Sequence, residues 1–150
     1  TSSICSNQAL SALAATVHLA LLGPHGLRER GEICLRRAHH LHAALCALPG
    51  VRPLVTGPFF LEFALALPCP AAEFAQAMRG HGVDPGVPLT RLLLGADAGP
   101  SGAGTSPGGL VPEHVLLVAV TEINTPEALD RYVAAARETL AALTPEEPTP

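Results

Sequence analysis

The chain has 150 residues, a formal net charge of −4 at pH 7, and a composition that is 48% hydrophobic and 15% charged. This length fits one domain with a core of its own, and the small charged fraction, against an average of about a quarter, predicts that apolar surface meets a partner. The acidic balance and the lack of an arginine run exclude a phosphate-backbone footprint, so we expect no nucleic-acid partner.

The first predicted helix extends from about Ile4 to Leu22 and ends at Gly23-Pro24, because glycine and proline each terminate helices. Apolar residues surround it almost completely, so we expect a helix that protein buries on several sides. The stretch approaches the roughly 20 residues of a membrane span, but polar residues interrupt it and we expect no membrane partner. These residues are Ser6, Asn7, Gln8, Ser11 and His18.

A second helix is predicted from about Gly26 to Leu48, with Leu27, Ile33, Leu41, Leu45 and Leu48 facing inward, and it ends at Pro49-Gly50. After residue 50 the spacing of the apolar residues changes from a helical period to alternation along the chain. Residues 59–67 predict a strand with Phe60, Glu62 and Ala64 on one face and a wholly apolar opposite face.

A short helix is predicted over residues 71–80, with Phe74, Ala75 and Met78 inward, followed by a strand over residues 89–94. Residues 95–113 are rich in Gly, Ala, Ser and Pro and predict a flexible loop. Residues 115–121 predict a strand, Thr125-Pro126 starts a helix that continues to about Leu143, and residues 144–150 predict a disordered tail. This order indicates an α+β fold, a small antiparallel sheet covered by helices on one face behind connecting helices.

Two side-chain groups leave alternatives open. His39, His42 and Cys46 share a helix face through steps of three and four, which would suit zinc, but a fourth ligand is missing and solvated or capping histidines fit the spacing as well. The arginines at positions 28, 30, 36 and 37 would suit an acidic partner subunit, yet Glu29 and Glu32 between them also fit an ordinary charged helix surface.

Glu62 and Glu122 could each act as a general base if buried, but a strand residue and a strand-to-helix junction favour structural roles, such as pairing with an arginine. The four cysteines show no Cys-x-x-Cys spacing and no secretory signal precedes them, so we expect reduced thiols in a cytoplasmic protein. They are Cys5, Cys34, Cys46 and Cys69.

Three ordered motifs carry a family resemblance. Residues 1–8 read TSSICSNQ, residues 58–63 read PFFLEF, and Val120-Thr121-Glu122 is followed by Thr125-Pro126-Glu127. They resemble the TSNICTNQ, PFFNEF and VTE-x-x-T-x-E motifs of the first subunit of decarboxylating glycine dehydrogenase, the P-protein of the glycine cleavage system. The resemblance spans nearly the whole chain and implies the C-terminal portion of that subunit.

The resemblance implies the C-terminal domain fold of aspartate-aminotransferase-type pyridoxal phosphate enzymes, with connecting helices at 1–48 and a small α+β domain at 49–143. Relative to the family, the loop at residues 95–113 resembles an insertion. It implies support of glycine decarboxylation on pyridoxal phosphate, with aminomethyl transfer to the lipoyl H-protein. All nine basic residues are arginine. Because the cofactor is anchored as a Schiff base on lysine, the resemblance implies a lysine of the partner, glycine dehydrogenase subunit 2.

Hydroxyl residues ahead of a helix can hold an anion, or can simply cap their own helix. In the light of the resemblance, Thr1, Ser2, Ser3 and Asn7 are the candidate cofactor-phosphate residues, although serine replaces the asparagine of the family at position 3. No catalytic residue and no metal ligand is expected. The alternative function is a non-catalytic protein-interaction or regulatory α+β domain; a pyridoxal phosphate enzyme complete in itself is nearly excluded by the missing lysine.

Overall fold

The computed structural model describes residues 8–89 and 112–144. In chain order its elements are α1 (Ala9–Cys46), β1 (Arg52–Pro53), β2 (Glu62–Ala66), α2 (Ala71–Gly80), β3 (Val87–Pro88), the 3-10 helix η1 (Pro112–His114), β4 (Val115–Ala119) and α4 (Pro126–Leu143). The order of helices and strands confirms the α+β class.

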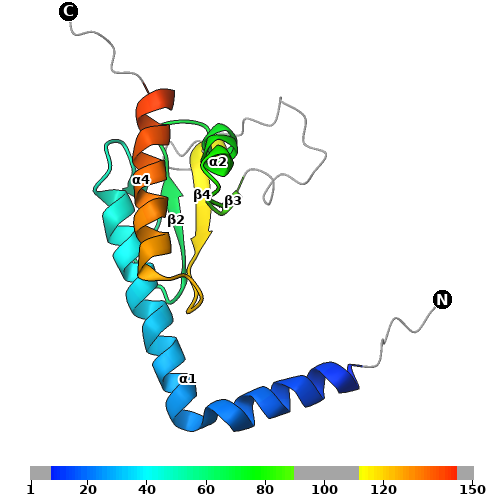
Figure 1. The fold of residues 1–150 in the computed structure, drawn as a ribbon. Coiled ribbons are helices and arrows are strands. Elements are labelled where there is room, and N and C mark those ends of the chain that lie inside the picture. Colours follow the sequence, from blue (N-terminus) through cyan, green and yellow to red (C-terminus); the bar gives the residue numbers. More distant parts are fainter. Residues whose placement is uncertain (1–7, 90–111, 145–150) are drawn as a thin grey trace, which may run out of the picture.

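The strands form one sheet in the order β1-β2-β4-β3, with every neighbouring pair antiparallel. In the central pair, Phe63 lies opposite Val118 and Leu65 opposite Leu116. These four side chains are buried, whereas Glu62 on the alternate face of β2 is exposed. One face of the sheet is therefore covered by α1, α2 and α4 (Figure 1), as the alternation in residues 59–67 predicts.

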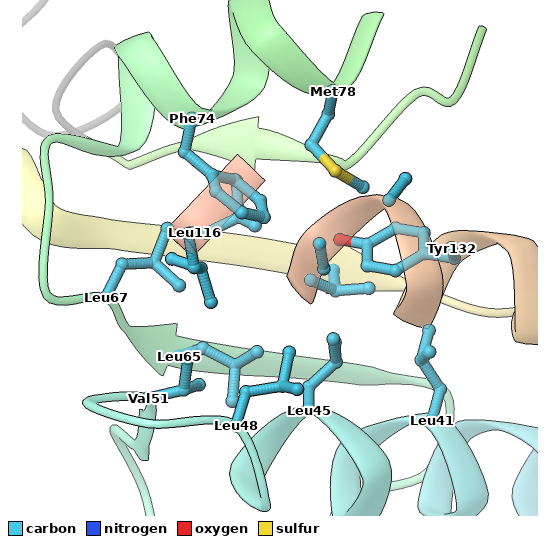
Figure 2. Packing of buried hydrophobic residues seen from close by; sticks show 14 of the residues in the cluster. Leu41, Leu45, Leu48, Val51, Leu65, Leu67, Phe74, Met78, Leu116 and Tyr132 are labelled. Carbon is cyan, nitrogen blue, oxygen red and sulfur yellow. The ribbon is translucent and has the colours of Figure 1, made fainter. Parts of the chain in front are cut away.

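The core lies between that face and the three helices. Figure 2 shows Leu41 and Leu45 of α1, Phe74 of α2 and Tyr132 of α4 converging on the side of the sheet that carries Leu65. All five are at most 7% exposed. Burial of this apolar surface is the main favourable term in folding.

The helix α1 is bent at Gly23, which has φ 61° and ψ −176°, and Pro24 follows it. The predicted break is thus confirmed. The part before the bend, residues 9–22, is here called the arm; it leads away from the sheet (Figure 1). Leu10 is 78% exposed and Leu21 82% exposed, so the described part of this chain does not bury the arm, and its burial by another protein segment stays a prediction. The bend turns the arm away from the core that the described residues form.

The part of α1 after the bend packs on the sheet through Leu41 and Leu45, as predicted, and the helix ends at Cys46. Leu27, predicted to face inward, is 46% exposed and that expectation is wrong. Leu27 lies just after the bend, where the helix has not yet reached the sheet (Figure 1).

Two helices follow the sequence closely. The bounds of α2 agree with the prediction, and Phe74, Ala75 and Met78 are its inward residues. α4 begins at Pro126, and the hydroxyl of Thr125 accepts a hydrogen bond from the backbone N–H of Ala128 at 3.2 Å. A capping hydroxyl and a proline at the first helical position therefore start α4 as predicted.

The positions of the short strands differ from those predicted from the sequence. β2 begins at Glu62, not at residue 59. β3 is Val87–Pro88 and lies ahead of the strand predicted at residues 89–94. Of that predicted range only Leu89 is described, and it lies outside β3. Gly86 fixes this position: its φ is 113°, and a Cβ there would lie 2.2 Å from the carbonyl oxygen of Leu117. The close approach of the two backbones, not an apolar period, places β3.

Several predictions fall outside the described residues. Most of the predicted 95–113 loop and of the 144–150 tail lies there, while Pro112 and Glu113 belong to η1 and are not loop. The helix that was expected to start at Ile4 is described only from Ala9.

Candidate functional site

The four predicted cofactor-phosphate residues, Thr1, Ser2, Ser3 and Asn7, lie outside the described residues. The arm that follows them is described, and it begins at Ala9 with no acidic residue in its first turn. The first turn of a helix directs backbone N–H groups outward, and a nearby carboxylate would oppose an anion there. The described start of the arm thus carries no carboxylate in its first turn.

Glu122, in the turn between β4 and α4, joins that turn to α1. Its Oε1 lies 3.2 Å from Nη1 of Arg30, and its Oε2 lies 3.6 Å from Sγ of Cys34. Arg37 donates a hydrogen bond to the backbone carbonyl of Glu122. The backbone N–H of Glu122, the Arg30 guanidinium and the Cys34 thiol hold the pKa of this carboxyl below its usual value, against a smaller opposing effect of burial.

A general base needs a carboxylate whose pKa is raised toward neutrality. The lowered pKa of Glu122 and its pairing with Arg30 fit a structural carboxylate, as the sequence indicates. Glu62 lies exposed on β2, opposite Ala119. Neither residue has the environment of a general base. Arg30, which binds Glu122, belongs to the group of arginines whose role the sequence leaves open.

The histidines near the end of α1 bind the segment before β2. The His39 ring stacks on Phe59, with centroids 4.2 Å apart and planes 8° apart, and its Nε2 lies 3.1 Å from the Phe59 carbonyl oxygen. His42 meets the edge of Phe63 at 5.1 Å, and its Nε2 lies 3.7 Å from Cys46 Sγ. Burial, and then nearby His39, lower the pKa of His42.

Among the residues that the structure describes, no group of three or more His, Cys, Asp or Glu side chains could hold a metal ion. His39 and His42 pack on aromatic rings in place of the zinc ligation considered from their spacing. These contacts explain why two histidines stand on this face of α1: they attach the PFFLEF segment to the helix.

The described cysteines are free thiols, of which Cys34 and Cys69 are buried. Burial raises the pKa of Cys46 and, with the added effect of Glu73, that of Cys69. A reactive cysteine needs a lowered pKa and access to solvent. No nucleophilic cysteine is therefore found in the described part, and Cys5 lies outside it.

A cavity of about 740 Å³ lies beside the end of β4, between α4 and the loop before β3. Tyr132 forms part of its wall and donates a 2.7 Å hydrogen bond to the Pro85 carbonyl oxygen. The ionisable side chains around it are Glu62, His81, Asp84, Arg131 and Glu138. Three carboxylates against one arginine make this an unfavourable place for a phosphate group.

Among the described residues, one helix, α1, contains a stretch long and apolar enough to cross a membrane by length and composition alone, and none of that stretch is buried in the structure. This stretch covers the arm near the N-terminus, where the apolar side chains are exposed. Since α1 bends at Gly23, the part of it that packs on the sheet and the apolar arm are separate segments.

No protein-family model matches the chain. Curated relatives do: the chain is 45% identical over 125 residues to glycine dehydrogenase (decarboxylating) subunit 1 of Nitratidesulfovibrio vulgaris, covering 83% of this chain and 25% of the relative. It is 41% identical over 143 residues to the subunit of that name from Moorella thermoacetica, covering 94% of this chain and 28% of the relative. The chain thus spans about a quarter of the length of these relatives.

Solved structures agree. A crystal structure of glycine decarboxylase (P-protein) of the glycine cleavage system, in inhibitor-bound form, superposes with a TM-score of 0.74 and 37% identity, covering 93% of this chain and 28% of that chain. The aminotransferase TlmJ of Streptoalloteichus hindustanus has a TM-score of 0.56 at 20% identity over 79% of this chain and 34% of its own, which supports the fold alone. With these neighbours in sequence and structure, the chain belongs to the family of glycine dehydrogenase (decarboxylating) subunit 1.

Proposed function

We propose that this chain is the C-terminal portion of a glycine dehydrogenase subunit 1, and that it supports glycine decarboxylation and aminomethyl transfer without carrying them out alone. The observation that carries the proposal is the match over most of this chain to only about a quarter of relatives that bear this name. Residues 1–48 then connect to a larger domain that precedes them, and residues 49–143 form the small domain.

Pyridoxal phosphate supplies the electron sink for such a reaction when it is bound. The chain contains no lysine, so the residues present do not complete a site for this cofactor. The anchoring lysine belongs to the partner, glycine dehydrogenase subunit 2. Thr1, Ser2 and Ser3 contribute hydroxyl groups to the cofactor phosphate, and Asn7 orients that segment.

The exposed side chains of the arm support an interface with the rest of the enzyme. Leu10, Leu13, Val17 and Leu21 recur at helical spacing, and each is at least 49% exposed. An apolar stripe of this kind marks a surface that another protein segment covers. The preceding domain of the same subunit, or subunit 2, covers it in the complete enzyme.

The lipoyl H-protein is the acceptor of the aminomethyl group in this proposal, and the enzyme is cytoplasmic. Free thiols at Cys34, Cys46 and Cys69 support a reducing compartment. Covering of the arm by protein, rather than by lipid, supports the absence of a membrane partner.

The test is a reconstitution. The chain mixed with pyridoxal phosphate should show no absorbance from an internal aldimine, whether or not glycine is present. Glycine decarboxylation should appear only when the preceding part of subunit 1 and subunit 2 are added. Turnover by the chain alone would contradict the proposal.

The candidate residues are tested in the reconstituted complex. Replacing Thr1 by Val together with Ser2 and Ser3 by Ala should raise the apparent dissociation constant of the cofactor several-fold. Ser11→Ala is the matched control, because this hydroxyl residue is exposed on the arm beyond the predicted segment. Equal cofactor affinity in both variants would remove residues 1–3 from the site.

The second candidate is a non-catalytic interaction module, which the exposed arm favours on its own. In that case the chain should bind a protein through the arm, and adding it should leave decarboxylation by the other components unchanged. A rise in decarboxylation on addition of the chain decides for the first candidate.

A further inference from the structure

The bend in α1 is built into the chain by two neighbouring residues. Gly23 has φ 61°, in the left-handed region that glycine adopts without strain, and a Cβ there would meet nothing within 4 Å. Pro24 has no N–H to donate to the preceding turn, and its ring blocks a continuous helix. The arm therefore cannot continue straight into the rest of α1.

Contact across the bend is close. A Cβ added to Gly26 would lie 3.2 Å from Cδ2 of Leu22, tighter than most such contacts. Glycine at position 26 thus leaves room for the last side chain of the arm against the first turn after the bend.

A hydrogen bond also joins the two sides. Nη1 of Arg30 lies 3.0 Å from Nε2 of His18, twelve residues earlier. In a straight helix these residues would be about 18 Å apart along the axis, at about 1.5 Å per residue. Arginine has no acceptor atom, so Arg30 donates and His18 accepts on Nε2. The contact exists only in the bent conformation.

The same guanidinium nitrogen lies 3.2 Å from Oε1 of Glu122. Arg30 therefore connects His18 of the arm with the turn that begins α4. Glu122 is held in turn by Arg37, through its carbonyl, and lies 3.6 Å from the Cys34 thiol. The arm is thus tied to the packed domain, not only to its own helix.

We propose that Arg30 is a positioning residue, which fixes the direction of the arm relative to the domain by joining His18 to Glu122. This inference rests on the proposed function for its role in catalysis, because the arm directly follows the predicted phosphate-binding residues in the sequence.

The direction of the arm can be measured in the full 150-residue chain by electron paramagnetic resonance between two spin labels. Suitable label positions are Ser11 on the arm and Arg137 on α4, which are both exposed. Labels attached to a ketone-bearing unnatural amino acid avoid the native cysteines. The unchanged chain, diluted with unlabelled chain so that self-association adds no distances between labels, should give one narrow distance distribution.

Arg30→Gln and His18→Ala should each broaden this distribution or shift its mean by several ångströms, and the double variant should add little to either. The melting temperature of His18→Ala should not change, which separates positioning from general stability, whereas that of Arg30→Gln should fall slightly because its ion pair with Glu122 is lost. Arg28→Gln is the matched control, since Arg28 is an exposed arginine on the same helix. Arg30→Lys, which keeps a cationic donor, should restore much of the narrow distribution.

Distributions in Arg30→Gln and His18→Ala that equal the unchanged one would overturn the inference, as would an equal effect of Arg28→Gln or an already broad distribution in the unchanged chain. The role in catalysis is read separately, as cofactor affinity of the reconstituted complex. If Arg30→Gln changes the distance between the two labels but not the cofactor affinity of the complex, Arg30 is upheld as the positioning residue of the arm. The same result would count against residues 1–7 as the phosphate site.

Discussion

The hydroxyl of Tyr132 in α4 donates a 2.7 Å hydrogen bond to the carbonyl oxygen of Pro85, which lies in the loop before β3. Both residues are buried, so the bond ties the last helix to the edge of the sheet where solvent cannot compete. Tyr132→Phe leaves the Pro85 carbonyl unpaired, and we expect a loss of about 1–3 kcal/mol in the free energy of unfolding, measured with urea. An unchanged midpoint would show that the bond contributes nothing.

Tyr132 also predicts a response to alkaline pH. Burial, assisted by Asp84, raises the pKa of this phenol far above its usual value of 10. Its contribution to stability is therefore full below pH 10 and is lost as the pH rises further toward the folded-state pKa. Tyr132 is the single tyrosine and the chain has no tryptophan. Absorbance of the tyrosinate at 295 nm should hence appear together with unfolding, and ionisation near pH 10 in the folded chain would contradict the prediction.

Gly86 should not tolerate a side chain. Gly86→Ala places a Cβ 2.2 Å from the Leu117 carbonyl oxygen, at a φ of 113°. We expect a loss of at least about 2 kcal/mol in the free energy of unfolding. Gly80→Ala is the control, since Gly80 ends α2 with nothing within 4 Å of its added Cβ, and it should change stability by at most about 1 kcal/mol. Similar denaturation midpoints for the two variants would contradict the close approach of β3 to β4.

Thr139 offers a stabilising change. Its hydroxyl is buried in α4 and has no hydrogen-bond partner in the described part of the chain. Thr139→Val has nearly the same shape without the unpaired polar atom, so we expect a gain of about 1–2 kcal/mol in the free energy of unfolding. Thr139→Ser keeps the hydroxyl and removes a methyl group, and should lower stability. A Val variant less stable than the parent would count against an unpaired hydroxyl.

Glu122 predicts the response to acid. The pKa of its carboxyl lies below the usual 4.5, through its own backbone N–H first and Arg30 and Cys34 after that. The stabilising contribution is therefore present above pH 4.5 and disappears as the pH falls through the lowered value. Glu122→Gln should flatten the loss of stability below pH 4.5, measured as urea midpoints between pH 7 and 3. Glu62→Gln, an exposed carboxylate on β2, should leave the profile unchanged.

The arm predicts self-association of the chain when nothing else covers it. Leu13 is 59% and Val17 49% exposed, one helical turn apart on the same face. Replacing both by Gln should convert an associating sample into a monomer by light scattering, with an unchanged melting temperature. Leu41→Ala, in contrast, removes a buried side chain and should cost about 2–5 kcal/mol in stability. A monomeric parent chain would contradict this prediction.

The sequence predicted those elements whose signals are local. Thr125-Pro126 carries both the cap and the first-position proline of α4, and the alternation around Phe63 identifies the buried face of β2. The structural role of Glu122 could also be anticipated, because a carboxylate at a strand-to-helix junction finds backbone amides and arginines nearby. Its partners Arg30 and Cys34 could not, since they lie on a helix distant in the sequence.

Elements that form only through contacts between residues far apart in the sequence could not be predicted. β1 and β3 have two residues each and exist only through pairing, so no period reveals them. What covers the arm could not be predicted, because an apolar helix looks the same whether its cover belongs to the same chain or to another. The candidate phosphate residues, Thr1 to Ser3 and Asn7, remain predictions.

Because α1 bends at Gly23, a small rotation there moves the far end of the arm by a much larger distance than it moves the residues near the bend. Residues 9–22 form a rod about 20 Å long, at about 1.5 Å per residue. Rotation by about 10° at the pivot would move the far tip by about 3–4 Å, more than the length of a hydrogen bond. A small change in the bend angle at Gly23 would therefore displace the far end of the arm, and any group attached to it, by several ångströms.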